Sequence, residues 1–136
     1  MAVTTQMTEQ RYPTATAFLL TSAFWMIVGT GFGLLGATEL IAPDLTKHFS
    51  WLLFGRIRPI HINVVLFGFV TPGLLAAAFY YLPRLLRTEI YSERLGVFTA
   101  IAWNIFLATA VVSLAMGHSQ GREYAELIWP IDIMVV

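Results

Sequence analysis

The stretch WLLFGRIRPIHINVVLFGF, residues 51–69, decides how this chain is interpreted, because it places charged side chains directly before an apolar run. Arg56 and Arg58 stand at the start of that run, and His61 lies about one helical turn inside it. Ionisable groups inside a membrane span are rare and usually functional, and neutral imidazole is a good ligand for iron. Arginines at the rim would bind carboxylates such as haem propionates through paired hydrogen bonds. The pattern predicts an axial haem ligand beside a propionate anchor.

A second interpretation of the same three residues requires no cofactor. His61 would be a packed histidine that hydrogen-bonds to a neighbouring helix, and Arg56 and Arg58 would be ordinary contacts to lipid headgroups. The two interpretations have about equal weight when this stretch is considered alone. Gly68, on the same helical stripe as His61, favours the haem interpretation, because a glycine would leave room for a flat macrocycle.

Composition identifies lipid as the solvent of this chain. Its 136 residues are 57% hydrophobic and 12% charged, with a mean hydropathy of +0.71, and so short a chain cannot hide that much apolar surface in one water-soluble core. The 8 basic and 8 acidic side chains balance without a basic block, which argues against nucleic acid as a partner. With 0 cysteines, disulfides, thiolate catalysis, iron-sulfur ligation and thioether-bound haem are excluded, so any haem is held non-covalently.

The apolar runs predict an all-α integral membrane protein with three transmembrane helices and the start of a fourth. We expect the helices at residues 15–42, 59–82, 95–117 and 129–136, after a polar tail at residues 1–14. The last run is far too short for a hydrocarbon core of about 30 Å. Residues 15–136 would therefore be a partial domain of a longer subunit, either truncated or encoded separately from its remainder. Pro59 is expected in the first turn of the second helix, and Pro72 is expected to kink that helix.

The first predicted helix contains Gly31, Gly33 and Gly36 at the spacing of a dinucleotide-binding motif. That motif needs a preceding strand, and no segment of this chain is predicted to be one. Gly29 and Gly33, four residues apart, instead predict a small-residue face on which another helix packs closely.

Other polar side chains are expected to have structural or solvated roles. Trp103 and Asn104, midway along the third predicted helix, suit packing and hydrogen bonding between helices. His48 is expected to be a solvated loop residue. Tyr80 and Tyr81 are placed to anchor the second helix at the membrane interface.

The basic residues give a prediction of orientation in the membrane. Three spans place four basic residues on each side of the membrane: Arg11, Arg84, Arg87 and Arg94 on the side of the N-terminus, and Lys47, Arg56, Arg58 and Arg122 on the other. If Arg56 and Arg58 are committed to a buried anion, they no longer report orientation. The remaining basic residues then favour an N-terminus on the cytoplasmic side.

Two separated segments of the chain resemble one known family. They are FGRIRPIHINVVLFGFVTPGLLAAAFYY at residues 54–81 and GREYAELIWPID at residues 121–132, and APDL at residues 42–45 also agrees. Together they resemble the catalytic subunit of cbb3-type cytochrome c oxidases, the C branch of the haem-copper oxidase superfamily. The resemblance covers nearly all of the chain after the tail. It implies the subunit I fold of about twelve helices, of which this chain holds the first three and the start of the fourth.

The resemblance also implies roles for individual residues. His61 matches one axial ligand of the low-spin haem b, and Arg58 matches a contact of the haem propionates, where Arg56 is a further candidate. Glu123 and Glu126 match glutamates near the propionates, the first of which is linked to a calcium ion bridging the two haems. Without the resemblance, solvated loop carboxylates would be the simpler interpretation, although their spacing suits one hard cation.

The implied function is that of a terminal respiratory oxidase in the bacterial inner membrane. Electrons from a cytochrome c would pass through haem b to a haem-copper centre, which reduces oxygen to water with proton pumping. The second axial histidine, the high-spin haem ligand, the copper ligands and the cross-linked tyrosine belong to later helices of that family. Partners would be the remainder of subunit I and membrane-anchored c-type cytochrome subunits.

Two alternatives remain open at this point. A nitric oxide reductase also carries a haem histidine in this region, and a non-catalytic membrane assembly module would use the same helices without haem. The chain also departs from the family at two positions. Pro72 stands where the family often has glycine, and Glu39 stands where a neutral polar residue is expected, so its role is open.

Overall fold

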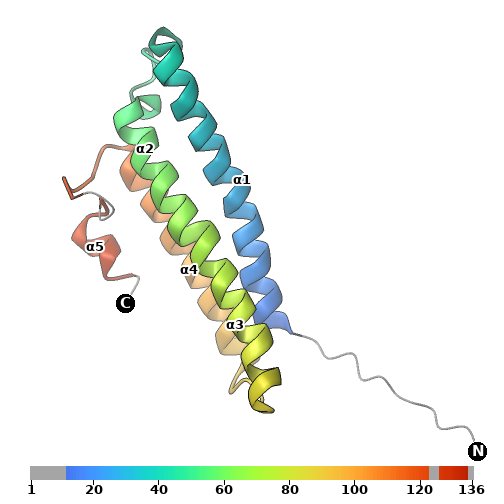
Figure 1. Ribbon diagram of the computed structural model, residues 1–136. Helices are drawn as coiled ribbons and strands as arrows, with labels where there is room; N and C mark the ends of the chain where they lie inside the picture. Colours follow the sequence, from blue (N-terminus) through green and yellow to red (C-terminus); the bar gives the residue numbers. More distant parts are fainter. Residues whose placement is uncertain (1–11, 123–125, 135–136) are drawn as a thin grey trace, which may run out of the picture.

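The computed structural model of the chain describes residues 12–122 and 126–134, and within these ranges every regular element is a helix (Figure 1). This confirms the predicted all-α class. In chain order the elements are α1 (Pro13–Ile41), the 3-10 turns η1 (Pro43–Leu45) and η2 (Ser50–Leu52), α2 (Phe54–Asn63), the π-helix η3 (Val64–Val70), α3 (Thr71–Leu86), α4 (Glu93–Ala115) and α5 (Trp129–Asp132).

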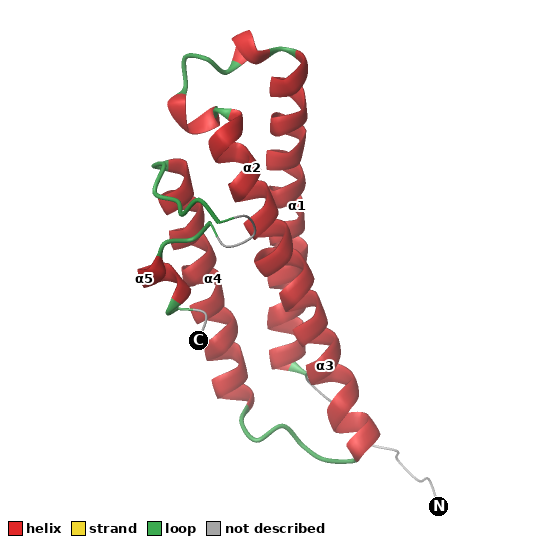
Figure 2. Ribbon diagram, turned by 60° about the vertical axis from the view of Figure 1, so that its left-hand side comes forward, coloured by secondary structure: helices red, strands yellow, loops and turns green. Residues whose placement is uncertain are grey.

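Three helices are long and apolar enough to cross a membrane, as the sequence predicted. They are α1 with 29 residues, the continuous helix Phe54–Leu86 with 33 residues and α4 with 23 residues. The continuous helix consists of α2, η3 and α3 placed end to end, and α1 packs along all three of these parts (Figure 2). The short α5 lies beside α4, to which it is connected by residues 116–128 (Figure 1).

The second span begins at Phe54 rather than at Pro59, so Pro59 lies inside the helix and the prediction for its first turn is wrong. Leu53 has extended backbone angles, and its carbonyl accepts hydrogen bonds from the N–H groups of Arg56 and Ile57 at 2.7 and 3.0 Å. Pro59 lacks the N–H that would bond the carbonyl of Gly55. That carbonyl belongs to the exposed first turn of the helix, where polar groups outside the helix can satisfy it.

The π-helical segment η3 ends at Val70, two residues before Pro72, and the kink predicted at Pro72 stays a prediction. A proline cannot donate a backbone hydrogen bond, and inside a membrane each carbonyl that loses its partner needs another. Side chains donate to three carbonyls of this segment, one of which, Leu66 O, also keeps a backbone hydrogen bond from Thr71 N–H. The donors are Thr71 Oγ1 to Leu66 O at 2.9 Å, Trp103 Nε1 to Phe67 O at 2.7 Å and Ser22 Oγ to Phe69 O at 2.8 Å.

Asn104 connects α4 to α1 at mid-depth. Its Oδ1 accepts a hydrogen bond from Trp25 Nε1 at 2.8 Å, and its Nδ2 donates to Thr21 Oγ1 at 2.8 Å. Each polar atom of this group is satisfied by another helix, which is how polar side chains hold membrane helices together. The interhelical roles predicted for Trp103 and Asn104 are confirmed.

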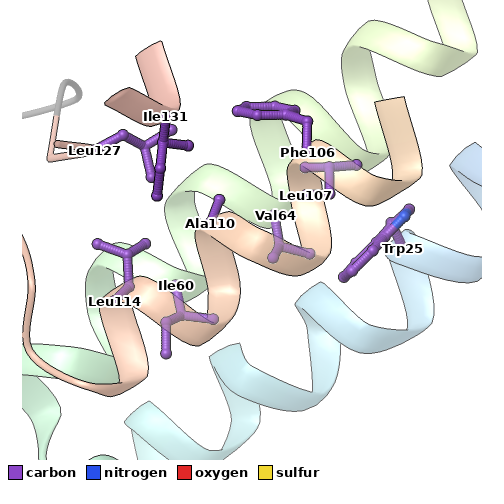
Figure 3. Close-up of a cluster of buried hydrophobic side chains, with 9 residues drawn as sticks. All are labelled: Trp25, Ile60, Val64, Phe106, Leu107, Ala110, Leu114, Leu127 and Ile131. Carbon is purple, nitrogen blue, oxygen red and sulfur yellow. The ribbon is translucent and has the colours of Figure 1, made fainter. Parts of the chain in front are cut away.

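The apolar core lies between α1, the second span and α4, and it extends to the segment that leads into α5. Leu127 and Ile131 bring this last part of the chain into the core and so fix it beside α2 and α4 (Figure 3). The cluster consists of Trp25, Ile60, Val64, Phe106, Leu107, Ala110, Leu114, Leu127 and Ile131.

At the end of the bundle where α3 connects to α4, the start of α4 is hydrogen-bonded to the start of α1. Thr14 is fully buried, and both its N–H, at 2.9 Å, and its hydroxyl donate to the Glu93 carboxylate. The carboxylate caps an N-terminal amide of α1 that the side chain of Tyr12 leaves uncapped. Gly96 allows this close approach, because a Cβ there would overlap the side chain of Thr14.

The substitution Gly96→Ala should therefore destabilise the bundle by roughly 1 to 3 kcal/mol, because the added methyl overlaps Thr14 and forces α1 and α4 apart. Thermal unfolding of the purified protein in detergent measures the effect. Gly55→Ala is the matched control, since a Cβ at Gly55 meets no atom within 4 Å among the described residues. Equal melting temperatures for the two variants would contradict the prediction.

Candidate functional site

His61 lies near the end of α2, and its imidazole packs against two glycines of α1. Its Nδ1 is 2.8 Å from the Gly29 carbonyl oxygen. A Cβ at Gly33 would lie 2.7 Å from His61 Cε1 and 2.9 Å from Nδ1, so the ring fills the space that a side chain would occupy. The small-residue face predicted at Gly29 and Gly33 is confirmed, and one of the groups packed on it is the candidate ligand itself.

The contact with Gly29 assigns the protons of the imidazole. A carbonyl oxygen only accepts hydrogen bonds, so Nδ1 of the neutral ring is the donor and Nε2 keeps its lone pair. Histidines that bind metals typically use one ring nitrogen for the metal and donate the other N–H to a carbonyl or carboxylate. The donor chemistry of His61 therefore fits one axial position of a haem iron, with Nε2 as the ligating atom.

The helical stripe that includes His61 packs on α1 along its length. A Cβ at Gly29 would lie 3.0 Å from Val65 Cγ2, and a Cβ at Gly68 would lie 2.7 Å from the Cβ of Trp25. Trp25 therefore fills the space beside Gly68. The expectation that Gly68 leaves room for a macrocycle is wrong, because its missing side chain instead lets α1 approach the second span.

Arg56 extends from the first turns of α2 to the C-terminal end of α4. Its Nη1 donates to Ala115 O at 2.8 Å, and a Cβ at Gly117 would lie 3.0 Å from its Nη2. Gly117 has a φ of +86°, and His118 N bonds Ser113 O at 3.0 Å, which is the usual hydrogen-bonded ending of a helix at glycine. The guanidinium thus binds a terminal carbonyl of α4, where the helix dipole favours a cation.

Arg58 is exposed on α2, in the turn that precedes His61. Arg58 and Arg56 therefore have different surroundings, although the same contact with haem propionates is predicted for both. The guanidinium of Arg56 donates its described hydrogen bond to the backbone of α4. The contacts of Arg56 and Arg58 with haem propionates stay predictions.

Glu126 is buried with 8% of its surface exposed, and it lies against the helix that carries His61. Its Oε2 accepts a hydrogen bond from Asn63 Nδ2 at 3.0 Å, and the same Nδ2 donates to Pro59 O at 2.8 Å. Asn63 is a site residue that the sequence interpretation missed. The signal was available, because an asparagine two positions after His61 in an apolar run is as unusual as the histidine.

The calcium site is only partly within the described residues. Glu123 lies outside them, so its position relative to Glu126 is not described. Among residues 12–122 and 126–134, no group of three or more His, Cys, Asp or Glu side chains is placed to hold a metal ion. The carboxylate of Glu126 has the right chemistry for calcium, and its participation stays a prediction.

Two further polar residues belong to the end of α1 and to the loop that follows it. Glu39 is buried near the end of α1, where its Oε1 accepts a hydrogen bond from Thr46 Oγ1 at 2.9 Å. Its Oε2 has no hydrogen-bond partner among the described residues. His48 is exposed in the loop after α1, as expected.

The described residues form three helices long and apolar enough to cross a membrane, and the second of these spans carries an imidazole that α1 holds in one orientation. The family is then established by sequence comparison. Residues 14–136 match the model of the family described as Cytochrome C and Quinol oxidase polypeptide I, and the chain belongs to this family. The resemblance seen in the motifs is thereby confirmed.

Relatives with known names include three bacterial oxidase subunits. The chain is 37% identical over 94% of its length to the cbb3-type cytochrome c oxidase subunit CcoN1 of Stutzerimonas stutzeri, 27% of which it covers. It is 38% identical over 88% of its length to cytochrome c oxidase subunit 1 of Rhodobacter capsulatus, covering 23% of it. It is 36% identical over 85% of its length to a cytochrome c oxidase subunit 1 homolog of Agrobacterium tumefaciens, covering 21%. The chain thus spans about a quarter of the length of these relatives.

Proposed function

We propose that this chain is a segment of the catalytic subunit of a cbb3-type cytochrome c oxidase, in which His61 provides one axial ligand of the low-spin haem b. The observation that carries the proposal is the match of residues 14–136 to the family described as Cytochrome C and Quinol oxidase polypeptide I. The hydrogen bond of 2.8 Å between His61 Nδ1 and the Gly29 carbonyl fits a packed histidine as well as a ligand, and it leaves Nε2 available to iron. The oxidase names of the relatives support the assignment.

Residues of α1 and of the second span orient the proposed ligand. The Gly29 carbonyl accepts a hydrogen bond from Nδ1–H, the ring fills the space left by the missing side chain of Gly33, and Val64 and Val65 pack against Gly29 of α1. When bound, the haem supplies reversible one-electron transfer between its ferric and ferrous states. Because His61 is held at two positions by α1, its ring would keep one orientation toward a bound haem.

For the assembled enzyme, we propose that electrons delivered by a cytochrome c reduce oxygen to water with proton pumping. The remainder of subunit I would provide the second axial histidine and the ligands of the high-spin haem and copper. Membrane-anchored c-type cytochrome subunits are the proposed partners, and the bacterial inner membrane with a cytoplasmic N-terminus is the proposed location.

Spectra and turnover of the purified complex that contains this chain test the proposal. A reduced-minus-oxidised spectrum should show low-spin haem b, and the complex should consume oxygen with reduced cytochrome c as donor. A complex without haem would identify an assembly module. Turnover of nitric oxide without oxygen consumption would identify a reductase instead.

The two arginines can be separated by substitution. Removing a positive charge from the haem propionates favours the oxidised haem, so Arg58→Ala should lower the haem b midpoint potential by roughly 50 to 100 mV without preventing insertion. Arg56→Ala should shift that potential only if Arg56 also contacts a propionate. Redox titration of both variants against Arg94→Ala, which changes an exposed charge at the opposite end of the bundle, decides each role. An unchanged potential in Arg58→Ala would contradict its assignment.

The calcium proposal has its own test in Glu123→Gln, which removes one negative charge while keeping the side-chain shape. Calcium affinity should fall by about tenfold or more, because this hard cation prefers carboxylate oxygens. Metal analysis of the assembled complex after treatment with a chelator gives the result. A complex that contains no calcium, or whose calcium content is the same with either residue, would contradict the assignment.

A further inference from the structure

Asn63 is a buried amide at the end of α2, two positions after His61, with 3% of its surface exposed. Its Nδ2 donates to Pro59 O at 2.8 Å and to Glu126 Oε2 at 3.0 Å. Carbonyl and ionised carboxylate oxygens only accept hydrogen bonds, so the nitrogen of the amide, and not its oxygen, must face both partners. The orientation of the amide is thereby assigned, and each of its two N–H groups has an acceptor.

The two hydrogen bonds of Asn63 have different consequences. In an α-helix the carbonyl of Pro59 also accepts the backbone N–H of Asn63, so that carbonyl does not depend on the side chain. The bond to it holds the amide against its own helix and directs the second N–H toward Glu126. The carboxylate of Glu126 receives its described hydrogen bond from Asn63 alone. A carboxylate this buried is strongly destabilised when its donor is removed, and it would turn toward other polar groups.

The backbone around Glu126 is held by contacts that do not involve Asn63. Gln120 N donates to Glu126 O at 2.7 Å, and Gln120 Nε2 donates to Leu127 O at 2.6 Å. Leu127 belongs to the same buried apolar cluster as Ile60 of α2 (Figure 3). The position of the Glu126 backbone is therefore set without Asn63, whereas the direction of its carboxylate depends on Asn63.

We propose that Asn63 is a positioning residue for the Glu126 carboxylate and that it thereby sets the calcium affinity of the assembled complex. The inference rests on the proposed function, in which Glu126 contributes to a calcium site. Asn63 acts through Glu126, because its own amide nitrogen is a donor and cannot bind a cation. Residues that orient the ligands of a metal ion typically change metal affinity by about 10- to 100-fold when they are removed.

Calcium titration of the assembled complex after treatment with a chelator tests the inference. Asn63→Leu removes the donor but keeps a branched side chain of similar shape, and calcium affinity should fall roughly tenfold or more. In a complex that already carries Glu126→Gln, the same substitution should have little further effect, because the charge that Asn63 directs is absent. The effects of the two substitutions are therefore expected to be strongly non-additive.

Asn104→Leu is the matched control, because it removes another amide that hydrogen-bonds between helices, from α4 to α1. It should lower the melting temperature of the complex and leave its calcium affinity at the parent value. Equal losses of calcium affinity in the Asn63 and Asn104 variants would show a general loosening of the bundle and overturn the inference.

Two further results would overturn the role of Asn63 alone: an unchanged calcium affinity in Asn63→Leu, or the same fold-change with and without Glu126→Gln. A parent complex that binds no calcium would overturn the calcium role of Glu126 together with it. Haem b spectra of the same samples test the haem assignment separately. If Asn63→Leu does not assemble, Asn63→Ala removes the same donor without adding bulk and is titrated in its place.

Discussion

Replacing His61 with alanine should abolish the low-spin haem b spectrum of the assembled oxidase while its helices still insert. Iron requires an imidazole nitrogen at a fixed position, and alanine provides no ligand. Insertion is governed by the apolar length of the spans, which this substitution does not reduce. Electron entry to the oxygen site would be lost as well, so oxygen consumption should fall to the background level. Optical spectra of parent and variant membranes at equal subunit content measure the effect.

His48→Ala is the matched control for this result, because His48 is a second histidine of the same chain that is exposed in the loop after α1. It should leave the haem b spectrum and oxygen consumption unchanged. A full low-spin haem b spectrum in the His61 variant would refute the assignment. Loss of the spectrum in both variants would point to a general defect in assembly instead of a lost ligand.

The three spans could be predicted from the sequence because each is set by a long apolar run. The ends of the runs were less certain, since polar residues near a membrane interface are compatible with helix or loop. The second span shows this, because Phe54 and not Pro59 starts it. A proline is tolerated there, since the carbonyl it leaves unpaired lies in the exposed first turn.

The π-helix before Pro72 could not be predicted, because its stability depends on donors from other helices. Ser22 of α1 and Trp103 of α4 bond carbonyls within η3. Neither residue is near η3 in sequence, and a local pattern contains no information about such contacts. The kink predicted at Pro72 stays a prediction, whereas the π-helical form of the segment before it required the packed bundle.

For the candidate site too, the local sequence and the packing of the helices contribute different information. The isolated intramembrane position of His61 was sufficient to nominate it as a ligand. Its tautomer was not predictable, because that depends on the Gly29 carbonyl on another helix. Arg56 and Arg58 are nearly adjacent in sequence, yet one reaches the end of α4 and the other is exposed. Sequence spacing identified the chemical groups, and only the packing of the helices distinguished their surroundings.

Substituting Gly33 with alanine should lower haem binding almost as much as removing a residue that orients His61, although Gly33 has no side chain. The added Cβ would lie 2.7 Å from His61 Cε1 and 2.9 Å from Nδ1. Contacts this short are not tolerated, so the imidazole must move away from α1 and lose its hydrogen bond to Gly29. Loss of such an orienting partner typically lowers metal affinity by about 10- to 100-fold. We therefore expect less haem b per subunit and a shifted midpoint potential.

Gly31→Ala provides the control for this prediction, because it makes the same chemical change on the same helix at a position where a Cβ meets no described atom within 4 Å. Both substitutions should favour the helical backbone of α1 slightly, since glycine is a poor helix residue. Any difference between them therefore reports the contact with His61. Haem content and redox titration of the two variants give that difference. If Gly33→Ala retains the haem content and potential of Gly31→Ala, the imidazole does not depend on α1 for its orientation, and the role assigned to the Gly29 carbonyl must be abandoned.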